Sequence, residues 1–460
     1  MIENRRTTVN GRIIVGGKGR KHPKEADVFL HIAMKVAKNC RYVEPQFTLR
    51  FDKETSEEIW DEALDALGAG ATYPTLYNDD VNVPAVMYGM RVDEKTAEQY
   101  VPFGCTEFVI QGQSTGTPNI CINLLKLLTI YMNDGIDPID GKRKSGPVSL
   151  KKLEEYQTFE EFYDGYKALL DYYLDLSVKA QYHSYEVMNQ HVSFLFTSLL
   201  TDDCIARGKA LLDGGVRYLG GTNETYGNIN TSDSLWVIRD LVFNQKKYTL
   251  RQLNDAMLAN FNGYEALRKD CLNCDKYGND LETADTMAND LYEFVAKGVR
   301  NRGIAIGMQY FLIVISNNQL NTEWGNRTAA SPDGRLSCMY MNPANNPQGG
   351  ANKSGPTAML NSLAKFDAKY HGGSVQNIKF SPSMFNENRA VIKSLFKTYF
   401  AKGGCHLMVT VVDKGVLEDA VEHPENYPDL IVRVSGFSAV FVDLSPNIQQ
   451  ELLSRVLYDK

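Results

Sequence analysis

One cysteine of this chain lies in a setting that could support chemistry. Cys105 stands in the run Gly104-Cys105-Thr106-Glu107, with a short helix expected over 93–100 before it and a Gly/Ser/Thr-rich loop over 111–117 after it. A lone cysteine is usually an inert core residue. This one has a carboxylate two positions on and a polar loop beside it, and these neighbours favour a functional thiol.

A second stretch of interest lies near the end of the sequence. Apolar runs over 430–434 and 439–442 flank Ser435-Gly436-Phe437. Glycine suits a turn that needs a positive φ or a close backbone approach, so the pattern predicts a strand, a turn and a second strand. Taken alone, Gly436 is an ordinary turn glycine.

Together the two stretches resemble a known family. The run 433–439 (Arg-Val-Ser-Gly-Phe-Ser-Ala), with Gln449 and Arg455 behind it, resembles the C-terminal signature of the glycyl radical enzymes, the pyruvate formate-lyase-like family. The Gly-Cys-x-Glu run at 104–107 resembles the cysteine-loop motif of the dehydratase and lyase branches. The motifs follow the family's order and approximate spacing. Further landmarks extend the resemblance over nearly the whole chain: 276–280, 331–335, 355–357, 377–382 and 423–427.

The resemblance implies a radical mechanism and assigns roles to three residues. Gly436 becomes the radical storage site, because a glycine α-carbon has no side chain to crowd a planar radical centre. The radical is installed by a separate activating enzyme that uses S-adenosylmethionine and an iron–sulfur cluster. Gly436 then takes hydrogen from Cys105, and the resulting thiyl radical abstracts hydrogen from a small substrate. Glu107 is the candidate general base, since burial raises a carboxyl pKa towards the working range. No bound cofactor or metal is implied.

The resemblance also bears on which reaction is catalysed. Pyruvate formate-lyase uses two adjacent cysteines, but Cys105 is flanked by Gly104 and Thr106, which disfavours formate acetyltransferase activity. The Gly-Cys-x-Glu pattern favours elimination by C–O, C–N or C–C cleavage, as in a dehydratase or another lyase. Phe108 stands where such members often have Pro, so arylacetate decarboxylation stays open. The anaerobic ribonucleotide reductase branch typically carries a C-terminal four-cysteine zinc site, which is missing here.

Several elements are expected to position these residues. The run 55–58 (Thr-Ser-Glu-Glu) predicts a capping box that opens a helix to about residue 67. An apolar run predicts a helix over 122–132, and 148–212 has the pattern of long helices. Residues 310–315 have the length of a core strand. Ser445 and Pro446 predict the start of a last helix, whose packed stripe is Ile448, Leu452, Leu453 and Val456.

Composition limits the other possibilities. The chain has 460 residues, a net charge of −7 and 43% hydrophobic residues. This balance gives no electrostatic case for nucleic acid or an anionic membrane. No apolar run is long enough for a membrane span, and residues 1–6 lack the apolar core of a signal peptide. The oxygen sensitivity that the resemblance implies leads us to expect an anaerobic cytoplasm. The eight cysteines are expected to be reduced, and a single CxxC pair, Cys271 and Cys274, does not make a structural zinc site.

The fold that the resemblance implies is α/β, a ten-stranded β/α barrel of two five-stranded halves, with the cysteine and glycine loops meeting inside. We expect a pyruvate formate-lyase-like barrel domain over 1–330, with its cysteine loop at 104–118, and a glycine radical domain over 331–460. Typical members are longer at the front, so the first half-barrel is expected to be largely missing. The chain is then a fragment, a natural truncation or half of a split enzyme. An inactive product, or a radical-domain repair partner, is a further alternative. Homodimers and anaerobic metabolism follow from the family.

Overall fold

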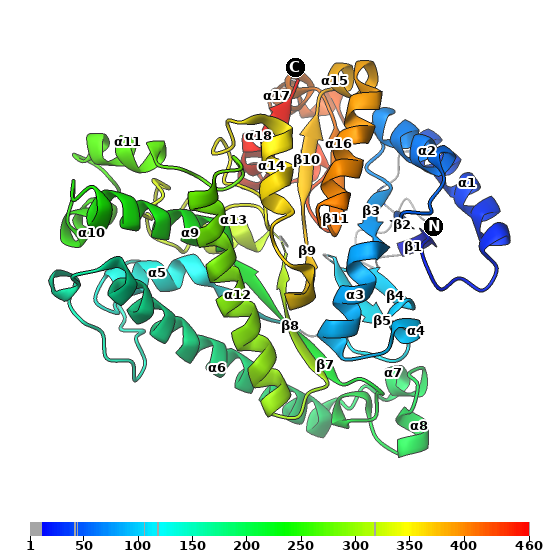
Figure 1. Ribbon diagram of the computed structural model, residues 1–460, viewed down its shortest axis with the longest axis horizontal. Coiled ribbons are helices and arrows are strands. Elements are labelled where there is room, and N and C mark those ends of the chain that lie inside the picture. Colours follow the sequence, from blue (N-terminus) through cyan, green and yellow to red (C-terminus); the bar gives the residue numbers. More distant parts are fainter. Residues whose placement is uncertain are drawn as a thin grey trace.

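A computed structural model describes residues 12–40, 43, 45–104, 106–116, 119–316 and 319–459 of the chain (Figure 1). Cys105 lies outside these described residues. Among the described helices, none is long and apolar enough to cross a membrane.

Two sheets of the described residues form the centre of the molecule. One has the strand order β1-β2-β3-β11-β10-β14 and the other the order β6-β7-β8-β9. Neighbours pair in parallel, except that β3 and β11 are antiparallel. The strands of the two sheets are β1 (Arg12–Gly16), β2 (Gln46–Phe51), β3 (Thr75–Asn78), β6 (Asn119–Asn123), β7 (Gly220–Tyr226), β8 (Tyr310–Ile315), β9 (His371–Ser374), β10 (Asn377–Phe380), β11 (His406–Val411) and β14 (Leu457–Tyr458).

The two sheets are joined at β9 and β10, which are consecutive in the chain. Val375 donates its N–H to the Ile315 carbonyl of β8, and Met408 of β11 donates to the Gln376 carbonyl, at 2.9 and 2.8 Å. Backbone bonding therefore continues across the bend, and the strands from β6 to β1 form one connected wall. Three parallel strands, β1 to β3, stand on the far side of the antiparallel pair. The ten-strand barrel remains a prediction from the resemblance.

Helices cover this wall, as Figure 1 shows for α12 beside β7 and β8 and for α14 and α16 beside β10 and β11. Their apolar faces and the β-branched strand residues make one large core. The helices are α1 (Pro23–Asn39), α2 (Glu57–Gly68), α3 (Asp79–Met90), α4 (Glu94–Ala97), α5 (Leu124–Met132), α6 (Phe159–His191), α7 (Leu195–Leu199), α8 (Cys204–Arg207), α9 (Asn228–Val237), α10 (Leu250–Leu258), α11 (Glu265–Asn273), α12 (Glu282–Ala305), α13 (Leu320–Gly325), α14 (Gly355–Leu363), α15 (Pro382–Glu387), α16 (Arg389–Ala401), α17 (Lys414–Glu422) and α18 (Pro446–Ser454).

Two short antiparallel hairpins lie against the wall. The first pairs β4 (Tyr100–Phe103) with β5 (Glu107–Ile110), and the second pairs β12 (Ile431–Arg433) with β13 (Ser438–Val440). The first contacts β1 through β4 and β9 through β5, while the second contacts β11 through β12. A separate small apolar cluster joins the second hairpin to α17 and α18. The predicted strand–turn–strand around Gly436 is therefore confirmed.

Other predicted elements are confirmed with shifted ends. The strand over 310–315 and the start of the last helix are where they were expected. The helix ends at Ser454, so Val456 lies beyond it, and Leu453 and Val456 are only half-buried. The helix over 148–212 is one long helix, α6, followed by two short ones.

The N-cap of α2 is Ser56 and not Thr55, because the Ser56 hydroxyl accepts from Ile59 N while the Thr55 hydroxyl accepts from Asp52 N. Residues 122 and 123 belong to β6, since strand pairing with β7 continues to Asn123, whose side chain then caps α5. The helix over 93–100 shrinks to α4, because its last residue begins the hairpin strand β4.

Candidate active site

The described residues of the cysteine motif lie at the closed end of the first hairpin. Phe103 pairs with Glu107, so the strands are joined by only three residues, 104–106. Gly104 has φ +54° and Thr106 has φ +88°. A positive φ is ordinary for glycine but strained for threonine, and such strain persists only where the surroundings hold the backbone in place. The tight pairing therefore fixes the backbone on both sides of position 105.

Glu107 begins β5 and faces back over this turn. Its side chain is buried, with the residue 3% exposed. A Cβ added to Gly104 would lie 2.6 Å from Glu107 Oε2, so the carboxylate packs directly on the glycine. The Glu107 carboxylate is therefore held beside the backbone of the cysteine motif, and its role as a base remains a prediction.

The glycine motif forms the turn of the second hairpin. Gly436 is buried, and Val434 donates its N–H to the Phe437 carbonyl across the turn. Two residues of the sequence signature hold the hairpin from behind. Arg455 Nη2 donates to the Val434 carbonyl at 2.7 Å, and Gln449 Nε2 donates to the Phe441 carbonyl at 3.0 Å. Arg455 and Gln449, which accompany the glycine in the sequence signature, therefore stabilise the segment that carries Gly436.

One arginine joins the two turns. Arg12, the first residue of β1, donates from Nη2 to the Gly104 carbonyl at 2.6 Å and to the Gly436 carbonyl at 3.1 Å. The two carbonyl oxygens are therefore no further apart than the sum of these distances. The structure thus brings together the backbones of the cysteine and glycine motifs, as the resemblance predicted.

A buried polar cluster surrounds this junction. Burial raises the pKa of Tyr77 to about 12; the charges of Arg12 and Arg433 oppose this rise and that of Glu107 adds to it. Burial also lowers the pKa of His406 well below its usual value, and both arginines act in the same direction. His406 is 1% exposed, and its two ring nitrogens have no hydrogen-bond partner among the described residues. The site therefore offers a neutral imidazole beside two cations.

Arg433 makes a second connection between the glycine hairpin and the wall. Its Nη1 donates to Gln46 Oε1 of β2 at 3.2 Å and to Ser438 Oγ of β13 at 3.3 Å. Ser438 in turn donates to Thr72 Oγ1. Gln46 Oε1 also accepts from Arg12, so the two arginines share one acceptor. Strand β2 therefore fixes both cations.

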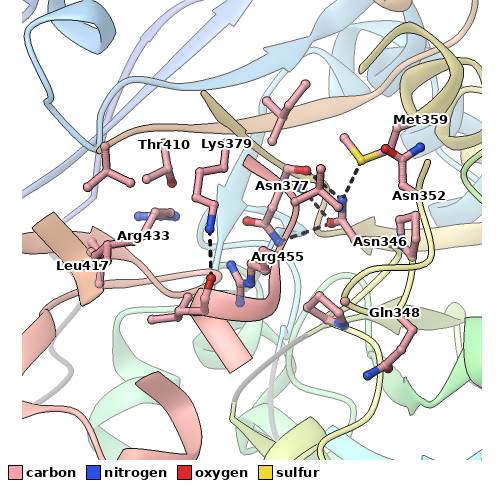
Figure 2. Close-up of a pocket in the computed structure, with 18 residues that line it drawn as sticks. Asn346, Gln348, Asn352, Met359, Asn377, Lys379, Thr410, Leu417, Arg433 and Arg455 are labelled. Carbon is pink, nitrogen blue, oxygen red and sulfur yellow. Dashed lines mark hydrogen bonds between the residues drawn. The ribbon is translucent and has the colours of Figure 1, made fainter. Parts of the chain in front are cut away.

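A cavity of about 50 Å³ lies behind the glycine hairpin, between β10, β11, β12 and α18. Figure 2 shows Lys379, Arg433 and Arg455 around it, with Lys379 Nζ donating to the Leu452 carbonyl. Burial lowers the pKa of Lys379 to about 8, and the charge of Arg455 adds to this effect. None of the three predicted site residues is among its described lining residues. The cavity lies between the wall, the glycine hairpin and the segment 343–352.

Metal ligands are grouped elsewhere on the described chain. His31 of α1 and Glu58 and Glu62 of α2 place potential ligand atoms within 4.8 Å of one another, on a partly exposed surface. His31 Nδ1 is already hydrogen-bonded to Glu62. The seven described cysteines are free thiols, Cys271 and Cys274 included.

Of the predicted site residues, Glu107 and Gly436 are thus placed at one junction, and Cys105 lies outside the described residues between two placed neighbours. Arg12, Tyr77 and His406 were missed. An arginine at a strand end, or a tyrosine and a histidine in apolar strands, carries no local signal of such a role. Only the approach of β1, β3 and β11 brings them together.

Family comparisons agree with the two motifs. The sequence profile described as "Pyruvate formate lyase-like" matches residues 5–320, and the one described as "Glycine radical" matches residues 341–442. The predicted domain boundary at 330 lies between the two matches and remains a prediction.

Individual relatives are dehydratases and a decarboxylase. The chain is 30% identical over 428 residues to trans-4-hydroxy-L-proline dehydratase of Clostridioides difficile, covering 92% of this chain and 54% of the relative. It is 26% identical over 497 residues to the glycyl radical subunit of 4-hydroxyphenylacetate decarboxylase of C. difficile strain CD196, with 97% and 54% covered. Its fold matches the glycerol-bound form of the B12-independent glycerol dehydratase of Clostridium butyricum with a TM-score of 0.90 at 28% identity, covering 98% of this chain and 57% of that one. The chain spans about half the length of these relatives.

Proposed function

Because this chain belongs to the pyruvate formate lyase-like family of glycyl radical enzymes, we propose that it provides the radical residues of a dehydratase or related lyase. Gly436 stores the radical, Cys105 carries it to the substrate, and Glu107 acts as general base. The observation that carries this proposal is the junction of the two turns, because hydrogen transfer requires the donor and acceptor atoms to be close. A bond from Arg12 to the carbonyls of both motifs supports that proximity.

The glycine domain implies a radical installed by an activating enzyme, and we propose a partner of the S-adenosylmethionine and iron–sulfur type. That enzyme removes one hydrogen atom from the Gly436 α-carbon. The glycyl radical then takes the hydrogen atom of the Cys105 thiol, which restores the glycine and leaves a thiyl radical. The thiyl abstracts a hydrogen atom from a substrate carbon. After the substrate radical has reacted, it recovers a hydrogen atom from Cys105, and the thiyl recovers one from Gly436.

Elimination from the substrate radical needs a base. A hydroxyl bonded to the radical carbon becomes more acidic, Glu107 accepts its proton, and the leaving group departs from the adjacent carbon. Burial of Glu107 supports this role, since it keeps the carboxylate out of bulk water and beside the backbone of the cysteine motif. The buried position also supports exclusion of water and oxygen from the radicals.

We favour a small hydroxylated substrate. Next to the radical residues, Thr106 Oγ1 and Ser435 Oγ are buried with no hydrogen-bond partner among the described residues, as are the ring nitrogens of His406. Buried polar atoms are normally hydrogen-bonded, so these groups suit a ligand with several hydroxyls. Greater identity to a hydroxyproline dehydratase than to the decarboxylase agrees with elimination. Decarboxylation is the second candidate.

Anaerobic electron paramagnetic resonance tests the proposal. The chain is incubated with its activating enzyme and S-adenosylmethionine, with a full-length relative as control for the activating enzyme. We expect a doublet that Gly436→Ala abolishes, and oxygen should then cut the backbone near residue 436. Activated chain is next assayed with trans-4-hydroxy-L-proline, glycerol and 4-hydroxyphenylacetate. No signal, under conditions that activate the relative, would mean that this chain does not form the radical.

A further inference from the structure

We infer that Arg12 is a positioning residue that holds the cysteine turn and the glycine turn in register for hydrogen transfer. This inference rests on the proposed function for its purpose. The contacts that carry it are independent of that function. Arg12 Nη2 reaches the Gly104 carbonyl, directly before Cys105, and the Gly436 carbonyl of the radical residue itself.

The position of Arg12 is fixed by its own strand. Arg12 lies opposite Gln46 in the parallel ladder of β1 and β2, and its Nη2 donates to Gln46 Oε1 at 3.1 Å. All three acceptors, Gln46 Oε1 and the two carbonyls, share the two N–H bonds of Nη2, and the planar guanidinium holds this nitrogen in a set position. The ladder therefore determines where the guanidinium lies between the two turns.

The two turns lie on separate hairpins, and Arg12 bonds to both of them. They are 92 and 424 residues from Arg12 along the chain, and each is a hairpin supported by its own turn geometry. A carbonyl oxygen accepts a charged donor more strongly than a neutral one, because the bond is charge-assisted. One guanidinium nitrogen on both carbonyls thus couples any shift of one turn to the other.

Hydrogen transfer is sensitive to such a shift. A misplacement of about 1 Å can cost about 100-fold in rate when reacting atoms must meet in a near-attack geometry. Loss of Arg12 should therefore slow hydrogen exchange between Cys105 and Gly436 while the activating enzyme can still generate the Gly436 radical.

Exchange of the Gly436 α-hydrogen in D₂O measures this step without a substrate. The glycyl radical takes deuterium from the S–D group of Cys105, which forms the C–D bond and a thiyl radical. Return transfer of the original hydrogen to sulfur leaves a deuterated glycyl radical, and the resonance doublet collapses. The rate of collapse is compared in the full chain and in the variants Arg12→Ala, Arg12→Lys, Cys105→Ser and, as a matched control on the next loop, Arg20→Ala.

We expect Arg12→Ala to accept the radical and to slow the collapse by about 100-fold, with partial rescue in Arg12→Lys, whose ammonium can still donate to a carbonyl. Arg20→Ala should behave as the parent, since Arg20 bonds to Gly17 and Asp27 instead. Collapse at the parent rate in Arg12→Ala, with none in Cys105→Ser, would overturn the positioning role alone. Collapse at the parent rate in Cys105→Ser would overturn the proposed function.

A second measurement decides the matter if the chain accepts no radical. Amide hydrogen exchange by mass spectrometry reports local opening of the two hairpins directly. Arg12→Ala should increase amide exchange over both 101–110 and 431–440. Arg20→Ala should change amide exchange in neither segment. Unchanged protection of both hairpins in Arg12→Ala would show that the guanidinium does not hold them.

Discussion

Gly373 of β9 lies directly against the carbonyl of Thr106: a Cβ added to Gly373 would come within 2.3 Å of the Thr106 oxygen and 2.8 Å of Glu107 N. Only glycine allows the cysteine turn to approach β9 this closely. Strand β9, at which the two sheets are joined, therefore also packs directly against the backbone at Thr106 and Glu107.

The first prediction concerns this contact. Gly373→Ala must push the turn away from β9, because the neighbouring atoms are backbone and cannot rotate aside. We expect a loss of about 1–3 kcal/mol in the free energy of unfolding by urea and slower deuterium exchange at Gly436. The adjacent Gly372→Ala is the control, since its Cβ would meet only side-chain atoms of β8, the nearest being Leu312 Cβ at 3.3 Å. Equal behaviour of the two variants would contradict the prediction.

The second prediction concerns the proposed base. Glu107→Gln keeps the shape of the side chain but removes its ability to accept a proton. We expect radical yield close to that of the parent and turnover reduced by about 10²–10⁴-fold, measured by resonance and by product formation. The exposed Glu94→Gln, on α4 just before the hairpin, should change neither quantity. Undiminished turnover in Glu107→Gln would remove Glu107 from the mechanism.

The third prediction concerns the anchor of β4. The buried Asp79 carboxylate accepts from Arg50 Nε and Nη2 at 2.9 and 2.8 Å and from the Tyr100 hydroxyl at 2.7 Å. Asp79→Asn leaves the Arg50 charge buried without its counter-ion, and we expect a loss of about 3–5 kcal/mol in urea unfolding. Asp80→Asn, which removes a partly exposed pair with Lys18, should cost less than about 1 kcal/mol. A small effect at Asp79 would mean that the buried pair does not stabilise the hairpin.

The fourth prediction concerns pH. Burial lowers the pKa of His371, in β9, to about 4, while the charge of Asp367 opposes this shift. The unfolded chain binds a proton at this histidine near pH 6.5, but the folded chain does so only near pH 4. Stability is therefore lost as pH falls between these values, by about 2 kcal/mol from pH 7.5 to pH 5. In His371→Gln, the free energy of unfolding by urea should fall by about 2 kcal/mol less than in the parent between pH 7.5 and pH 5. An unchanged slope would show that His371 is not held neutral.

Local sequence patterns were enough to predict several elements of secondary structure and the family of this chain. The hairpin around Gly436, the strand over 310–315 and the last helix follow from alternation, turn residues and caps, which act between neighbours in the chain. The two motifs also identified the family, because their residue types and order are specific. Errors at helix ends arose where a strand ladder or a different hydroxyl outcompeted the pattern, as at Asn123 and Ser56.

Tertiary structure alone decided which distant groups share the site. Arg12, Tyr77 and His406 lie on β1, β3 and β11, and nothing in their local sequence distinguishes them from strand residues that pair or pack elsewhere. Their side chains meet because the antiparallel pairing of β3 with β11 places the β1–β3 strands beside the glycine hairpin. A charged hydrogen bond depends on distances of about 3 Å, and such distances between segments hundreds of residues apart are set by packing of the whole wall. The sequence determined which reactive residues are present. The fold determined that Arg12 holds the turns at Gly104 and Gly436 together.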